Sequence, residues 1–104
     1  MKTIYKYTFD IKPEVQDFEY PKHGALLHID KDTRNRWEGA MWFEVDLPEW
    51  PAKESEVKPI LKKVKLAVVG TGGIIPEGNF EYYGSFMVAE FIWHIYMDIF
   101  AYEE

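Results

Sequence analysis

The sequence predicts a mainly β protein, built as a single-domain antiparallel β sandwich or small barrel of six or seven strands with little helix. Polar and apolar residues alternate with period two along most of the chain, which is the pattern of strands that bury one face. These segments are short and are separated by turn-forming residues, as in sandwiches and barrels. The 104 residues suffice for one domain, and 47% hydrophobic residues supply its core.

The first half of the chain is expected to hold four strands, at residues 2–9, 16–20, 25–30 and 36–46. The first is rich in β-branched and aromatic side chains, which favour strands. A polar hairpin loop at residues 31–35 precedes the fourth, which shows the most regular alternation. Gly39 lies inside that fourth strand and indicates a bulge or a close approach of another group.

The second half begins with residues 47–59, whose prolines predict an exposed proline-rich loop rather than a central strand. A helical turn within this loop would lie at residues 53–57. A second helical turn would lie at residues 76–79, in a later connection. Three more strands are expected, at residues 60–69, 80–88 and 91–102.

The last expected strand is apolar on both of its faces, so it is either central in its sheet or covered on its second face by another subunit. A helix is the competing interpretation, because twelve residues suffice for three helical turns. Its Ile, Phe, Tyr and Trp residues favour the strand.

Composition argues against several classes of function. The net charge is −6, and Arg34 and Arg36 are the only arginines, so general nucleic-acid binding is not expected. The absence of cysteine excludes disulfides, thiol chemistry and cysteine-ligated metals. Three histidines without a carboxylate pattern predict no metal site, and we expect no other cofactor. No apolar run reaches membrane-spanning length and the first residues do not resemble a signal peptide, so a cytoplasmic protein is expected.

Five segments occur in a characteristic order: MKTIYKY, RWEGAMWFEVD, GTGGIIPEG, YYGSF and FIWHIYM. In these the chain resembles a family of small bacteriophage and prophage proteins with no assigned activity. Members of that family open on a Met-Lys-Thr-Ile-Trp-Lys-Tyr strand, carry a Gly-Thr-Gly-His-Pro-Ile segment and close on a strand that contains Trp-His. This chain departs from the family at Gly73 and Ile74, and its loop at residues 47–59 is long. The resemblance implies a phage-encoded protein acting in the host bacterial cytoplasm, where small phage proteins often counter host defences.

The glycine-rich segment after the fifth expected strand is the main candidate for a binding site. Glycines can present backbone N–H groups to an anion, although this segment lacks the lysine of a P-loop. A tight turn is the plainer interpretation of the glycines. For the lysines that precede them, the plainer interpretation is that they protect an exposed sheet edge. The residues predicted to bind a ligand are Gly70, Thr71, Gly72, Gly73, Lys63, Lys65, Trp93, His94 and Tyr96.

The last strand supplies the aromatic part of that candidate site. His94, Tyr96 and Asp98 share one face, which would suit a ligand pocket or a general base with an orienting carboxylate. A half-buried, hydrogen-bonded histidine is the plainer interpretation. No serine-hydrolase motif is present, so we expect a protein without enzymatic activity.

Outward-facing aromatic residues exceed what so small a core can hide, and they predict self-association. The aromatic side chains concerned are Trp42, Trp50, Tyr82 and Tyr102. The expected function is therefore that of a non-enzymatic, self-associating binding protein that sequesters a small anionic, nucleotide-like ligand. The alternative is a protein–protein inhibitor of a host defence enzyme.

Overall fold

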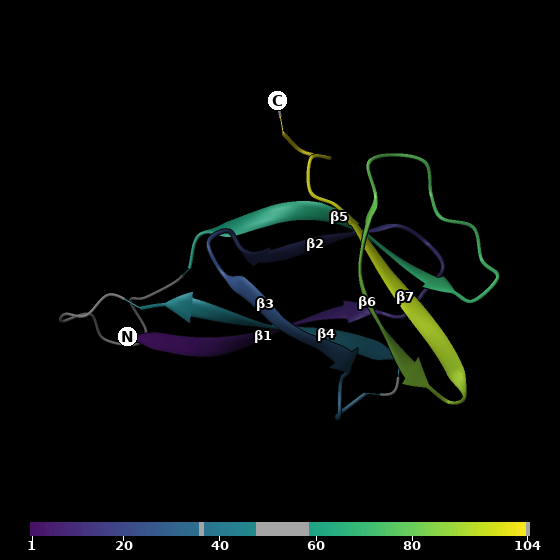
Figure 1. Ribbon diagram of the computed structural model, residues 1–104, viewed down its shortest axis with the longest axis horizontal. Coiled ribbons are helices and arrows are strands. Elements are labelled where there is room, and N and C mark those ends of the chain that lie inside the picture. Colours follow the sequence, from purple (N-terminus) through teal and green to yellow (C-terminus); the bar gives the residue numbers. More distant parts are fainter. Residues whose placement is uncertain (36, 48–58, 104) are drawn as a thin grey trace.

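The computed structural model describes residues 1–35, 37–47 and 59–103, and these form two antiparallel β-sheets packed face to face (Figure 1). The described residues contain no helix. This confirms the predicted fold class. The seven strands are β1 (Lys2–Asp10), β2 (Gln16–Pro21), β3 (Ala25–Lys31), β4 (Glu38–Asp46), β5 (Leu61–Gly70), β6 (Glu81–Val88) and β7 (Phe91–Asp98).

The strand order is β1-β4-β3 in the three-stranded sheet and β2-β5-β7-β6 in the four-stranded sheet. β7 is therefore a central strand, as one of the two sequence interpretations required, and the helical alternative for this segment is wrong. The edge strands β3 and β6 lie beside each other where the two sheets meet. Each of the two carries an irregularity in its register there, between Leu26 and His28 in β3 and between Tyr82 and Gly84 in β6.

The core lies between the inner faces of the two sheets. Alternate residues of each strand point into it, which is the physical basis of the period-two pattern. Tyr20 stacks on Phe43 with ring centroids 5.3 Å apart, which joins β2 of one sheet to β4 of the other. The largest fully buried side chains are Phe43, Met41, Leu66, Ile95, Met97, Val64 and Pro21.

Gly39 provides the close approach that its position in the sequence indicated. It pairs with Phe9 across β1 and β4, and a Cβ atom on it would lie 2.3 Å from Cζ of that ring. The Phe9 ring therefore occupies the space above the glycine and also packs edge-on against Phe18 of the opposite sheet. A side chain at position 39 would displace a ring that links the two sheets.

The structure differs from the sequence prediction at the end of the last strand and in the connection before β6. β7 ends at Asp98 rather than at residue 102, because the Asp98 carboxylate accepts a hydrogen bond of 3.0 Å from the Phe100 N–H and so begins a turn. No helical turn forms at residues 76–79, where residues 77–79 are bends and Pro76 has no regular structure. The helical turn expected at residues 53–57, and most of the loop expected at 47–59, lie outside the described residues.

A strained turn joins β6 to β7. Ala89 and Glu90 have φ angles of 50° and 71°, so both adopt the left-handed conformation that a two-residue type I′ hairpin needs. Neither residue is one of the glycines or asparagines that tolerate this conformation, and each costs about 1 kcal/mol or more there.

The double substitution Ala89→Asn and Glu90→Gly is expected to raise the free energy of unfolding by about 1–2 kcal/mol, since Asn-Gly is the preferred pair for this turn. Urea titration followed by circular dichroism measures the change. Glu77→Gly, at a loop position outside the left-handed residues, is the matched control and should not stabilise the protein. An unchanged or lower stability of the double variant would contradict the strain.

Candidate functional site

Gly70 to Gly73 form a reverse turn at the end of β5. The Gly73 N–H donates to the Gly70 carbonyl at 2.8 Å, and Gly72 has a φ of +89°. This conformation is strained for residues with a side chain, which accounts for the glycine at position 72. The geometry is that of a tight turn, the plainer of the two sequence interpretations, and it commits the Gly73 N–H to the turn itself.

The turn places Thr71 against His94, with 3.1 Å between the threonine Oγ1 and the histidine Nε2. The two meet because β5 pairs with β7 in a register that sets Val69 opposite His94. The Tyr82 ring lies 6.2 Å from the His94 ring and 5.5 Å from the Tyr96 ring. We call Thr71, Tyr82, His94 and Tyr96 the His94 cluster. Sequence analysis singled out Tyr82 as an exposed aromatic residue but missed its place here, which depends on the pairing of β6 with β7.

Asp98 shares the outer face of β7 with His94 and Tyr96, but its carboxylate anchors loops. One oxygen accepts from the Asn79 N–H at 3.3 Å, and the other accepts from the Phe100 N–H. It therefore ties the connection before β6 and the turn after β7 to the sheet.

Trp93 lies on the opposite, inner face of β7, so the structure does not place it with His94 and Tyr96. It pairs with Gly70, where an added Cβ would lie 3.3 Å from the indole ring. Its Nε1 is buried and has no hydrogen-bond acceptor among the described residues. Its part in the structure is packing against the core beside the glycine turn.

Lys63 and Lys65 lie towards the other end of β5, where they face Asp17 of β2. The Lys65 ammonium is 2.9 Å and the Lys63 ammonium 3.5 Å from the Asp17 carboxylate. The Tyr102 hydroxyl donates to the same carboxylate. Both ammonium groups also lie over the Tyr102 ring, that of Lys63 at 4.8 Å and that of Lys65 at 5.1 Å from the ring centroid. We call these four residues the Asp17–Tyr102 network.

The network changes the acidity of its members. The hydrogen bond from Tyr102 and that from Lys65 lower the pKa of Asp17 to about 2. The bonds with Tyr102 and Asp17 raise the pKa of Lys65 to about 12. Gly70 follows Lys65 by five steps along an extended strand, a span of about 16 Å. The predicted site is thus divided into the His94 cluster and a separate lysine-rich region.

A cavity of about 310 Å³ opens beside the network and is lined by Lys22, Leu61, Lys62, Lys63, Tyr102 and Glu103. We call it the lysine cavity. The Lys62 ammonium lies 2.7 Å from the Glu103 carboxylate, which raises the pKa of this lysine. No carboxylate of the described residues lies within ion-pair distance of Lys22. The sequence analysis missed Lys22, because only the pairing of Pro21 with Leu61 brings it to Lys62.

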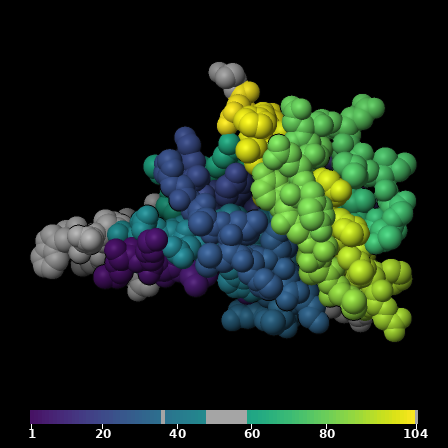
Figure 2. Space-filling model, viewed as in Figure 1, coloured from purple at the N-terminus to yellow at the C-terminus, as the bar shows by residue number. Residues whose placement is uncertain are grey.

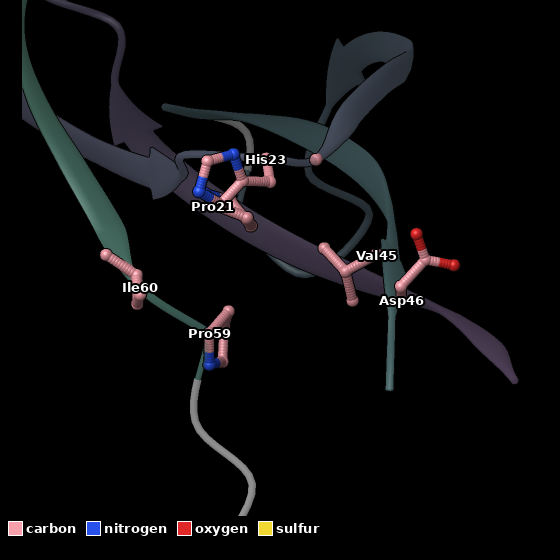
Figure 3. Close-up of a pocket in the computed structure, with 7 residues that line it drawn as sticks. Pro21, His23, Val45, Asp46, Pro59 and Ile60 are labelled. Carbon is pink, nitrogen blue, oxygen red and sulfur yellow. The ribbon is translucent and has the colours of Figure 1, made fainter. Parts of the chain in front are cut away.

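Two further cavities of about 260 Å³ each lie elsewhere. One is bordered by Pro21, His23, Val45, Asp46, Pro59 and Ile60, which come from β2, from β4, from the turn after β2 and from the residues just before β5 (Figure 3). The other lies at the seam between β3 and β6, beside His28 and Ser85. Within the described residues, no group of three metal-ligating side chains is gathered at these cavities or elsewhere.

The outward-facing aromatic residues have different environments. Trp42 is half-buried against His28, with ring centroids 5.5 Å apart. Tyr82 is 53% and Tyr102 43% exposed. Trp50 lies outside the described residues.

These features define a small β-sandwich protein whose polar and aromatic side chains gather on the outer face of its four-stranded sheet. The chain matches a domain of unknown function, DUF7352, over residues 1–103, and it belongs to that family. No curated protein and no solved structure matches it. Among the described residues, no helix has the length and apolar character needed to cross a membrane.

The Asp17 carboxylate is expected to stabilise the fold in a pH-dependent way. Its pKa is about 2 in the folded chain, below the ordinary value of 3.8, so its contribution is complete above pH 3.8 and is lost as the pH falls through 2. Asp17→Asn should therefore lower the melting temperature by a few degrees at pH 7, and by progressively less towards pH 2. Thermal denaturation across this range measures the difference.

Glu19→Gln is the matched control, because Glu19 shares the outer face of β2 and has no ion pair within the described part of the chain. A difference between Asp17→Asn and the parent protein that stays constant down to pH 2 would rule out the titration of Asp17 as its cause.

Proposed function

We propose that this protein is a non-catalytic binding protein that sequesters a small anionic, nucleotide-like ligand, and that the ligand binds in the lysine cavity. The observation that carries the proposal is the convergence of three lysines, Lys22, Lys62 and Lys63, on one cavity of a chain whose net charge is −6. Lysine ammonium groups bind phosphate oxygens as point charges, so their convergence favours an anion.

The aromatic wall of the cavity supports a ligand with a planar base. Tyr102 lines the cavity, and its ring is held in place by the hydroxyl bond to Asp17 and by the lysines above it. A ring fixed in this way loses little conformational entropy when a base stacks on it. Of the nine residues predicted from the sequence, Lys63 is the one that lines this cavity.

Glu103 competes with such a ligand. Its carboxylate already occupies the Lys62 ammonium at 2.7 Å, so a phosphate must displace it to reach that lysine. The Glu103 side chain is half exposed, which makes this displacement inexpensive. Affinity should accordingly rise when the carboxylate is removed.

The resemblance to small phage proteins suggests where the ligand would be met. A phage-encoded counter-defence factor in the bacterial cytoplasm would sequester a signalling nucleotide, so cyclic di- and oligonucleotides and ADP-ribose derivatives form the panel to test.

Differential scanning fluorimetry with this panel is expected to show a rise in melting temperature with at least one nucleotide, since a ligand that binds only the folded state stabilises it. For that nucleotide, Lys22→Ala should weaken the affinity measured by calorimetry by about tenfold, through loss of a charge-assisted contact. Glu103→Gln should strengthen it.

Lys31→Ala, at an exposed lysine of β3, makes the same change in net charge away from the cavity and should leave the affinity unchanged. No shift with any member of the panel would refute the proposed function. An equal effect of Lys22→Ala and Lys31→Ala would refute the site, because it would show a response to net charge alone.

A further inference from the structure

The outer face of the β6–β7 hairpin carries apolar side chains that the described chain leaves in water. Tyr82 is 53%, Met87 59% and Ile92 43% exposed. They share one face because Met87 pairs with Ile92 and Tyr82 pairs with Tyr96 across the two strands, with the Ser85–His94 pair between them. In Figure 2 the residues of β6 and β7, green to yellow, form a continuous band on one side of the molecule.

β7 has the composition of a strand that is buried on both faces. Its inner residues Ile95 and Met97 are fully buried in the core. Its outer residues Ile92, His94 and Tyr96 are also aromatic or apolar for the most part, although that face is only partly covered. Central strands with apolar residues on both faces are normally covered on both sides. The part of the chain that the structure describes leaves this side of β7 only partly covered, so a further surface could pack against it.

The same surface has no acidic residue, lysine or arginine. The residues that face outward from β6 and β7 between Tyr82 and the hairpin turn are Tyr82, Ser85, Met87, Ile92, His94 and Tyr96. Two copies of a chain with a net charge of −6 repel each other over most of their surface. They can approach most closely where the surface is neutral.

We propose that two copies of this chain associate through the outer face of β6 and β7, sheet against sheet, with the Met87–Ile92 pair beside the hairpin turn and the Tyr82–Tyr96 pair at the other end of the face. A flat sheet face is complementary to itself under a two-fold axis, and such faces pack about 10 Å apart. The exposed parts of Tyr82, Met87 and Ile92 amount to roughly 300 Å². A standard interface buries about 800 Å² on each partner, so the polar side chains that lie between these residues, Ser85 and His94, must contribute area as well.

An interface of this composition implies a dissociation constant in the micromolar range. Sedimentation equilibrium of the purified chain between about 10 and 500 µM therefore tests whether two copies associate. We expect the mean mass to rise from that of the 12.3 kDa chain towards twice that value. The double variant Met87→Lys and Ile92→Lys should remain at the monomer mass, because it sets four ammonium groups in the interface of the dimer.

Ile4→Lys, on the outer face of β1 in the other sheet, is the matched control, since Ile4 is 58% exposed and the variant should dimerise like the parent protein. Circular dichroism of each variant establishes that the fold is retained. Isotope-filtered NMR of the mixed parent protein should show contacts between copies at the Met87 methyl group.

A parent protein that stays at the monomer mass at every concentration would overturn the proposal. This holds even where the same face is found to bind a different protein. A folded double variant, with Met87→Lys and Ile92→Lys together, that dimerises as well as the parent would overturn it too. The lysine cavity shares no residue with this face, so either result leaves the proposed function to its own test.

Discussion

The pairing of β5 with β7 is the interaction on which the rest of this structure depends. It joins two central strands of the four-stranded sheet in a register that sets Val68 opposite Ile95 and Leu66 opposite Met97, so four core side chains meet on the inner face. The period of a strand is two residues, and a slip of one would carry the lysines of β5 into the core. The same register brings Thr71 to His94 on the outer face, so packing of the core determines the geometry of the surface.

Alternation in the sequence predicted the strands because it records burial directly. Val64, Leu66 and Val68 were assigned to one face of β5 and Lys63 and Lys65 to the other, and the structure has them so. Alternation contains no signal for where a strand stops, so the end of β7 was placed too late. That end depends on a hydrogen bond from Phe100 to the Asp98 carboxylate. The left-handed Ala89 and Glu90 were equally hidden, since neither residue type indicates such a turn.

The candidate site was harder to predict than the fold, because its composition depends on pairing between distant segments. Lys65 and Gly70 are near in sequence, but an extended strand holds them about 16 Å apart. Lys22 and Lys62 are far apart in sequence, but the pairing of β2 with β5 places them at one cavity. Asp17, which lies opposite Lys65, partly neutralises the positive charge of the lysines in β5. Local charge in a β protein is therefore a property of neighbouring strands rather than of one segment.

The strand order β2-β5-β7-β6 also separates two kinds of surface on one sheet. β2 and the first half of β5 present ionic side chains that pair with one another, whereas the outer face of β6 and β7 between Tyr82 and the hairpin turn has no acidic residue, lysine or arginine. Ionic side chains keep an exposed face hydrated and hinder association between copies, while a neutral apolar face favours it. The proposed anion site and the proposed dimer surface would then lie at opposite sides of one sheet. Since no residue belongs to both, occupation of one does not require the other to be vacant.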